Sequence, residues 1–275
     1  WLPVAVIGTG VIAFLEVMLG RSVGFWLLGE RSFTLATPSI ALFNWYGQVF
    51  LRPYATFSHP NVLAAFMLLS GLLLIFLSGL KSRFQIIYQL VVIGAVCLSF
   101  SRSSIAILLS TVFFFLRKQF LLLIFLFLFF SPLLFARFDS AFNFDQLSLI
   151  RREELAETAF AMVREHPLVG VGLNNFIPTA MSSSFISGTS RFLQPVHNIF
   201  LLSLSETGLI GLAGFLGFLV IPLFLYWPAG LLTWPQKISI FLVLVFLGIV
   251  DHYFLTLPQG QRMLFMLWGI FLIKK

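Results

Sequence analysis

Long apolar runs dominate this chain, and short polar stretches interrupt them at intervals close to one membrane thickness. A transmembrane helix needs about 20 mostly apolar residues. The runs that meet or approach this length are Leu2–Leu19, Val62–Gly79, Phe84–Phe100, Gln119–Ala136, Gly208–Trp227 and Ile238–Leu257. Two shorter runs, Ser104–Leu116 and Met263–Ile273, can also span if they tilt and include their polar ends. The pattern therefore predicts an all-α, polytopic transmembrane bundle of about eight spans.

Two longer segments, residues 20–61 and 137–197, break this rhythm. Within the second, apolar residues recur at helical spacing between Leu149 and Glu165, and Pro167 cannot continue a helix. Ser148 is a candidate N-cap for this amphipathic helix, which we expect to lie on the membrane surface. We interpret residues 1–275 as one membrane domain with 137–197 inserted between membrane helices. Because the chain opens inside an apolar run, we also expect further helices before residue 1.

The placement of the lysines predicts the orientation in the membrane. All five lie in short loops or at the C-terminal end, without Asp or Glu in the same loops: Lys81, Lys118, Lys237, Lys274 and Lys275. The positive-inside rule makes these regions cytoplasmic. Alternation of the spans then places 137–197 outside, together with all four histidines. Any functional site in residues 137–197 would therefore face away from the cytoplasm.

Composition agrees with this class of protein. Hydrophobic residues make up 59% of the chain and charged residues 10%, whereas soluble domains carry about 25% charged residues. The lysines inside and arginines outside account for the net charge of +7, so nucleic-acid binding is not indicated. No metal-ligand spacing such as HExxH or CxxC occurs, and no Walker loop, so we predict neither a metal nor a cofactor.

The outer face carries arginine rather than lysine, which favours bidentate recognition of phosphate or carboxylate. Arg102 lies between two apolar helices with no acidic residue nearby in sequence. Its partner would be an anionic ligand, or else Asp251 or Glu206 from another helix. His197, at the end of the outer segment, is a candidate base, because an imidazole titrates near neutral pH. Positioning a hydroxyl group and a purely structural role are its alternatives.

Residues after His197 raise further expectations. Glu206 would lie about 13 Å deeper on a continuous helix, so we expect it to pair with an arginine or with helix hydrogen bonds rather than with His197. Glycines at 208, 211, 214 and 217 favour close helix packing. Asp251, His252 and Arg262 fall near the outer end of the next helices, where they could support the same cavity.

Four motifs in order give the chain a family resemblance. The most specific is His197-Asn-Ile-Phe-Leu-Leu-Ser-Leu-Ser-Glu206-Thr-Gly208-Leu-Ile-Gly211. The others are Thr56-Phe-Ser-His-Pro-Asn61, Phe100-Ser-Arg-Ser-Ser104 and His166-Pro-Leu-Val-Gly-Val-Gly172. Across about residues 52–260, the chain resembles the bacterial O-antigen ligase and O-antigen polymerase superfamily.

The resemblance implies a glycosyltransferase that moves a glycan from an undecaprenyl-diphosphate carrier to the hydroxyl group of a lipid or glycan acceptor. It implies inverting, metal-independent chemistry. His197 matches the catalytic histidine, Arg102 the arginine between membrane helices, and Arg151 or Arg152 the loop arginine that would contact the diphosphate. We expect Arg52, His59, Glu206, Asp251, His252 and Arg262 to support the site. A polysaccharide polymerase is the alternative, with a small-solute transporter or a non-catalytic partner behind it.

Overall fold

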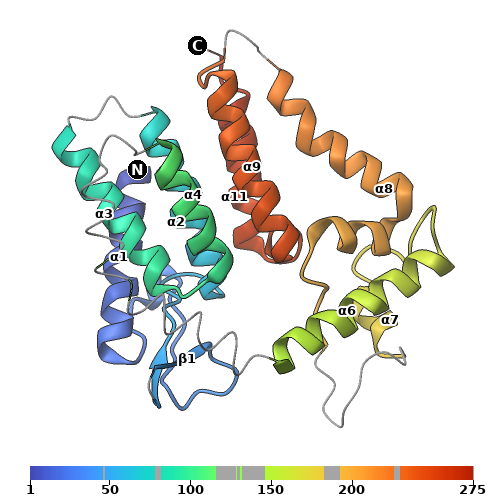
Figure 1. Ribbon diagram of the computed structural model, residues 1–275, viewed down its shortest axis with the longest axis horizontal. Helices are drawn as coiled ribbons and strands as arrows, with labels where there is room; N and C mark the ends of the chain where they lie inside the picture. The colour runs from blue at the N-terminus through green and yellow to red at the C-terminus, as the bar shows by residue number, and fades with distance from the viewer. Residues whose placement is uncertain are drawn as a thin grey trace. The chain divides into compact units, whose positions relative to one another are not determined.

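The computed structural model describes residues 1–45, 47–77, 82–115, 128, 131, 146–182, 193–225 and 230–274 (Figure 1). These residues form two compact units, Trp1–Asn143 and Phe144–Lys275, which we describe one at a time. The predicted span Gln119–Ala136 lies outside the described residues apart from Leu128 and Ser131. The predicted total of about eight spans, the single membrane domain and the inserted loop stay predictions.

Among its described residues, the first unit has four apolar helices that share a core of aliphatic side chains. They are α1 (Leu2–Leu19), α2 (Pro60–Leu77), α3 (Ser82–Leu98) and α4 (Arg102–Phe115). Each begins and ends within two residues of a run that hydropathy marked as a span. Gly20 ends α1 in the left-handed conformation, which glycine adopts without steric cost. The apolar pattern thus located these helices closely.

A small antiparallel hairpin follows α1 and is a departure from the all-α prediction. After the 3₁₀ turn η1 (Trp26–Leu28), strand β1 (Leu42–Trp45) pairs with β2 (Gln48–Leu51). The side-chain oxygen of Asn44 accepts a hydrogen bond of 2.9 Å from the Gly47 nitrogen, which stabilises the turn. Each strand has only four residues, so its alternation of apolar and polar positions is too short to be recognised among the apolar runs.

The second unit contains the amphipathic helix and the last membrane helices. Its elements are α6 (Gln146–Glu165), α7 (Phe176–Ala180), α8 (Ile199–Phe224), α9 (Trp234–Val250), α10 (Tyr253–Thr256) and α11 (Pro258–Phe271). Helix α6 ends at Glu165 as Pro167 predicts, but it begins at Gln146, so Ser148 lies inside the helix rather than at its N-cap. Buried side chains from α6, α7 and the start of α8 form a core of their own.

Two breaks in the membrane helices of this unit position the polar residues. Helix α8 begins nine residues earlier than the predicted span and is interrupted at Gly208 (φ 65°, ψ −168°), where it changes direction (Figure 1). Helix α9 stops at Val250, because Asp251 is extended (φ −154°). The predicted continuous run Ile238–Leu257 is therefore two helices, and the break between them carries Asp251 and His252.

The polar groups of this unit separate to opposite ends of α8 and α9. At one end, Lys237 donates hydrogen bonds to the carbonyl oxygens of Pro222 (3.4 Å) and Leu225 (3.1 Å). At the other end lie His197, before α8, and Asp251, after α9. This separation is the one that the lysine pattern predicts for the two sides of a membrane.

Candidate functional site

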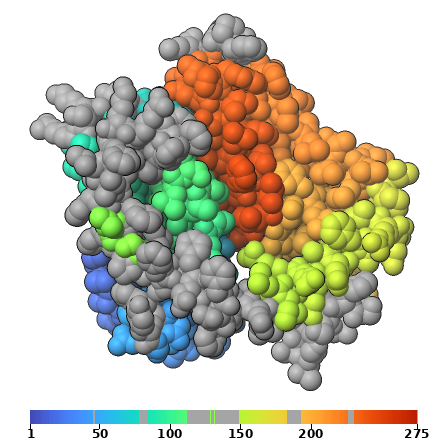
Figure 2. Space-filling view, in the orientation of Figure 1, coloured from blue at the N-terminus to red at the C-terminus, as the bar shows by residue number. Residues whose placement is uncertain are grey.

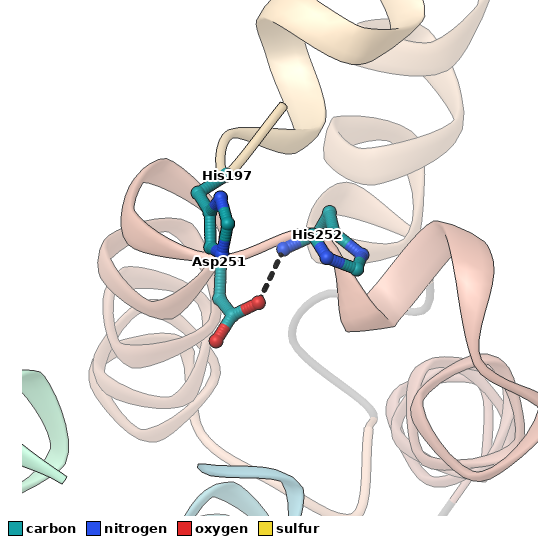
Figure 3. A group of neighbouring side chains, drawn as sticks. All are labelled: His197, Asp251 and His252. Atoms are coloured by element: carbon teal, nitrogen blue, oxygen red, sulfur yellow. Dashed lines mark hydrogen bonds between the residues drawn. The ribbon is translucent and has the colours of Figure 1, made fainter. Parts of the chain in front are cut away.

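A cluster of three polar side chains lies where α8 begins and α9 ends. His197 directly precedes Asn198, whose side-chain oxygen caps α8 by accepting hydrogen bonds from the nitrogens of Phe200 (2.9 Å) and Leu201 (3.0 Å). Asp251 and His252 come from the break after α9. Figure 3 shows the His197 ring directly above the Asp251 carboxylate, with the His252 ring to one side.

The three side chains lie close together, but they do not form a simple chain of side-chain hydrogen bonds. One ligating atom from each of His197, Asp251 and His252 lies within 4.8 Å of the other two. The rings of the two histidines meet edge to face, with centroids 5.2 Å apart. An Asp251 carboxylate oxygen accepts a 2.8 Å hydrogen bond from the His252 backbone nitrogen, which fixes the carboxyl group beside both rings.

Hydrogen bonds at the edge of the cluster orient the two rings. Nδ1 of His252 lies 2.6 Å from the hydroxyl oxygen of Thr256, one turn further along α10. Nε2 of His197 lies 3.3 Å from the side-chain nitrogen of Gln194, while its Nδ1 is buried and has no hydrogen-bond partner among the described residues. No local sequence pattern pointed to Gln194 or Thr256, because their positions beside the two rings depend on the folded chain.

Burial and nearby charge keep both imidazoles neutral. Burial lowers the pKa of His197 to about 4; the Asp251 carboxylate acts against this, whereas Arg152 and His252 act with it. Burial also lowers the pKa of His252, again opposed by Asp251 and reinforced by Arg152. At neutral pH, His197 is therefore an unprotonated base with a carboxylate placed to stabilise its protonated form.

The sequence did not decide whether Arg151 or Arg152 is the loop arginine that would contact the diphosphate, and the two side chains differ in their surroundings. Arg152, on α6, lies close enough to lower the pKa of both histidines, and its side chain is exposed. Arg151, one residue earlier, is half-buried. Arg262 lies on α11 with an exposed side chain. Arg152 therefore shares the electrostatic environment of His197.

The cluster raises the question of a metal ion, which the residue spacing had not suggested. Two imidazoles and a carboxylate are donors that zinc and other divalent transition metals use. The fold brings these donors together from positions more than 50 residues apart, so no local motif could reveal them. The Arg152 charge opposes a cation here, and we interpret the cluster as a group that handles protons.

Glu206 has the structural role expected of it, through hydrogen bonds rather than an arginine. Its carboxylate accepts a 3.2 Å hydrogen bond from the Phe176 nitrogen, at the start of α7, and also interacts with the Asn174 backbone. Glu206 therefore attaches α7 to α8.

The motif His166–Gly172 crosses the break in α8 at very close range. A Cβ atom on Gly208 would clash with the backbone of Leu168 and Val169, and one on Gly170 would clash with the backbone of Glu206 and Thr207. The two glycines are needed because the two backbones touch. Gly208 permits close packing as predicted, but against the backbone of a loop rather than against another helix. A Cβ atom on Gly214, by contrast, would meet nothing within 4 Å.

In the first unit, two of the motifs meet through Arg52. This buried side chain donates hydrogen bonds of 2.8 Å to the Ser99 carbonyl oxygen, just before α4, and to the side-chain oxygen of Asn61, at the start of α2. Nδ1 of His59 accepts a 3.1 Å hydrogen bond from the Asn61 nitrogen. Arg52 and His59 thus hold the turn from which Arg102 begins α4.

Arg102 itself is half-buried, in the first turn of α4. Beside it, the hydroxyl groups of Ser101 and Ser104 lie 3.0 Å apart. Phe100, immediately before, has a positive φ of 52° and stacks on Phe43. A guanidinium, a helix N-terminus and hydroxyl groups together favour an anion.

These features define an integral membrane protein: α1, α2 and α8 are each long and apolar enough to cross a membrane. A family model described as O-antigen ligase matches residues 87–216, and this match supports the resemblance of the chain to the O-antigen ligase superfamily. The match includes Arg102, Arg151, Arg152, His197 and Glu206, whereas Asp251 and His252 lie beyond it. A search of curated proteins found no match.

Proposed function

We propose that this protein is an O-antigen ligase-like glycosyltransferase that uses an undecaprenyl-diphosphate-linked glycan on the outer face of the membrane. The observation that carries the proposal is the state of His197. A half-buried, neutral imidazole lies near a carboxylate and within the electrostatic reach of an exposed arginine. Glycosyl transfer from a diphosphate carrier needs a group that accepts the proton of the acceptor hydroxyl and a cation that neutralises the leaving diphosphate, and these residues can supply both.

In the proposed reaction, the acceptor oxygen attacks the anomeric carbon of the carrier-linked sugar. The bond between that carbon and the carrier phosphate oxygen breaks, and the carrier diphosphate leaves with the bonding electrons. His197 takes the proton of the acceptor hydroxyl group through Nε2, and Asp251 stabilises the imidazolium that forms. Attack from the face opposite the leaving group inverts the anomeric configuration.

Arginines would neutralise the leaving diphosphate. Arg152 is exposed beside the cluster, and a guanidinium binds phosphate oxygens in a bidentate manner. We propose that Arg102 also binds carrier phosphate, as the family resemblance implies, and that Arg52 holds the turn from which its helix begins. Fixed guanidinium groups aimed at a leaving group can replace a divalent cation in stabilising it. The proposed reaction is therefore metal-independent.

The pH dependence of transfer tests the role of His197. A base acts in its unprotonated form, so kcat/KM falls as the pH drops through the pKa of that base in the free enzyme. Because burial holds the pKa of His197 at about 4, we expect transfer to remain near its maximum at pH 5.5. An ordinary histidine, with a pKa of about 6.5, would have lost about 90% of the rate there. A fall centred near pH 6.5 would contradict this assignment.

The Arg152→Gln variant extends the same test. Removing this charge removes an influence that lowers the pKa of His197, so the acidic fall in rate should move to higher pH. Loss of a charged contact to phosphate should also lower kcat/KM by about 10- to 100-fold. Arg164→Gln, an exposed arginine on the same helix, is the matched control and should change neither property. An unchanged pH profile in Arg152→Gln would contradict the proposed site.

A further inference from the structure

The loop of residues 166–173, which we call the crossing loop, lies across the break in α8 and is bonded to it on both sides of Gly208. Before the break, the nitrogens of Val171 and Gly172 donate to the carbonyl oxygens of Ser205 (3.0 Å) and Glu206 (2.8 Å). After the break, the direction of donation reverses. The nitrogens of Leu209 and Ile210 donate to the carbonyl oxygens of Pro167 (2.9 Å) and Leu168 (3.2 Å).

These bonds satisfy backbone N–H and C=O groups of α8 that the break in the helix would otherwise leave without hydrogen-bond partners. Within the crossing loop, the Gly170 nitrogen also donates to the His166 carbonyl oxygen at 2.9 Å, continuing the end of α6. Glu206 fixes the segment that follows through the Phe176 nitrogen. Irregular backbone is tolerated near membrane depth where it packs against protein, and these bonds hold one side of the crossing-loop backbone directly against α8.

The outward side chains of the crossing loop are apolar and unusually exposed. Leu168 is 59% exposed, Val169 67% and Leu173 71%. Beside them on α8, Leu209 is 52% and Ile210 65% exposed. The surface of α6 adjoins that of α8 in Figure 2. The backbone bonds of Leu209 and Ile210 to the loop bring the exposed side chains of the loop and of α8 together into one apolar patch. A soluble loop rarely displays such a group of side chains.

The position of the patch along α8 identifies what covers it. From Gly208 to Phe224 the helix rises about 25 Å, close to the thickness of the hydrocarbon layer. Leu209 and Ile210 therefore lie at one margin of that layer, and backbone bonds hold Leu168 at the same level. Because His197 precedes α8, the lysine-based orientation makes this the outer margin.

We propose that the crossing loop is a membrane-inserted anchor, whose side chains Leu168, Val169 and Leu173 lie among the acyl chains of the outer leaflet. The sequence pattern assigned residues 137–197 wholly to an outer loop. In this proposal, the middle of that segment enters the outer leaflet. The anchor holds α6, and with it Arg152, against the membrane surface. The occupant of the patch is lipid, not a second copy of the chain or a partner protein.

Site-directed spin labelling tests the anchor without any assay of glycan transfer. The chain has a single cysteine, so Cys97→Ala provides the background. Labels at Leu168→Cys, Val169→Cys and Leu173→Cys are measured one at a time in vesicles of phosphatidylethanolamine and phosphatidylglycerol. Collision rates with oxygen, which concentrates in lipid, are compared with those of a water-soluble nickel complex. All three side chains are exposed, so the labels should not disturb the core.

Reference labels on the same unit calibrate the result. Ile210→Cys and Ile221→Cys report shallow and deep lipid on α8, and Glu165→Cys, at the exposed end of α6, reports water. We expect oxygen-to-nickel ratios at the three loop positions to match Ile210 and to exceed Glu165 by about tenfold, because a polar complex is excluded from hydrocarbon. Ratios equal to that of Glu165 would place the loop in water and overturn the proposal. Low collision rates with both reagents would show protein covering the patch, and would overturn it too.

Discussion

Replacing His197 with alanine is expected to reduce the rate of glycan transfer by about 10²- to 10⁴-fold, the usual contribution of a positioned base. The neutral imidazole, which lies beside Gln194, is the proposed base of the cluster. Asp251 can stabilise the charged form of this imidazole, but we do not expect it to replace the base. Side-chain removal leaves the Asn198 cap of α8 intact, so the variant should still fold. The rate is measured with purified protein, a carrier-linked glycan and an acceptor.

His166→Ala is the matched control for this variant. His166 lies in the same unit with its side chain exposed, and its contribution to the crossing loop is through its backbone carbonyl oxygen. We expect it to transfer glycan at nearly the normal rate. A folded His197→Ala protein that transfers as fast as His166→Ala would show that the histidine is structural, or that the chain is a non-catalytic partner.

A single methyl group at Gly208 is expected to destabilise the second unit severely. A Cβ there would overlap the backbone of Leu168 and Val169, and φ is 65°, so neither the side chain nor the backbone can relieve the clash. We expect Gly208→Ala to lower the free energy of unfolding by about 3 kcal/mol or more. The hydrogen bonds of Leu209 and Ile210 to the crossing loop would break with it.

Gly214→Ala on the same helix is the control for this effect. Its Cβ would meet nothing within 4 Å, and alanine favours helix over glycine by about 0.5–1 kcal/mol. Thermal unfolding in detergent, followed by the loss of monodisperse protein, compares the two variants. The account of the crossing is wrong if Gly208→Ala unfolds at the same temperature as Gly214→Ala.

Hydropathy predicted much of the fold, because burial in lipid places the same demand on every spanning helix. The bounds of α1 to α4 fall within two residues of the apolar runs, and Pro167 marked the end of α6. The separation of Lys237 from His197 along α8 and α9 also follows the charge pattern. These features depend on local composition, which a sequence displays directly.

The breaks and crossings were not predictable, because they depend on contacts between distant segments. Gly208 looked like one of a regular series of packing glycines, and nothing local distinguished it from Gly214. Its unusual backbone is required by the approach of Leu168, about 40 residues earlier. In the same way, the helix break at Asp251 lies in a run apolar enough to be one helix, and the short β1–β2 hairpin is hidden among apolar residues.

The candidate site was predicted in part. Its residue types were evident, because a histidine and arginines on one face of an apolar chain are costly unless they serve a purpose. Three features needed the folded chain: the clustering of Asp251 with both histidines, the electrostatic effect of Arg152 on His197, and the link from Arg52 to the turn before Arg102. The roles of all these residues in transfer stay predictions.

The most direct test of the central proposal is a transfer assay with a divalent-metal chelator present. Purified full-length protein is given undecaprenyl-diphosphate-linked glycan with a lipid or a glycan acceptor, and both products are measured. We predict that glycan appears on one acceptor with an equal amount of released carrier diphosphate, at a rate that chelation does not change.

A lipid acceptor would indicate a ligase and a glycan acceptor a polymerase. Transfer that stops with chelator and returns with a divalent metal would contradict the account, and would make His197, Asp251 and His252 a metal centre. Folded protein that binds the carrier yet transfers nothing to either acceptor would contradict it as well.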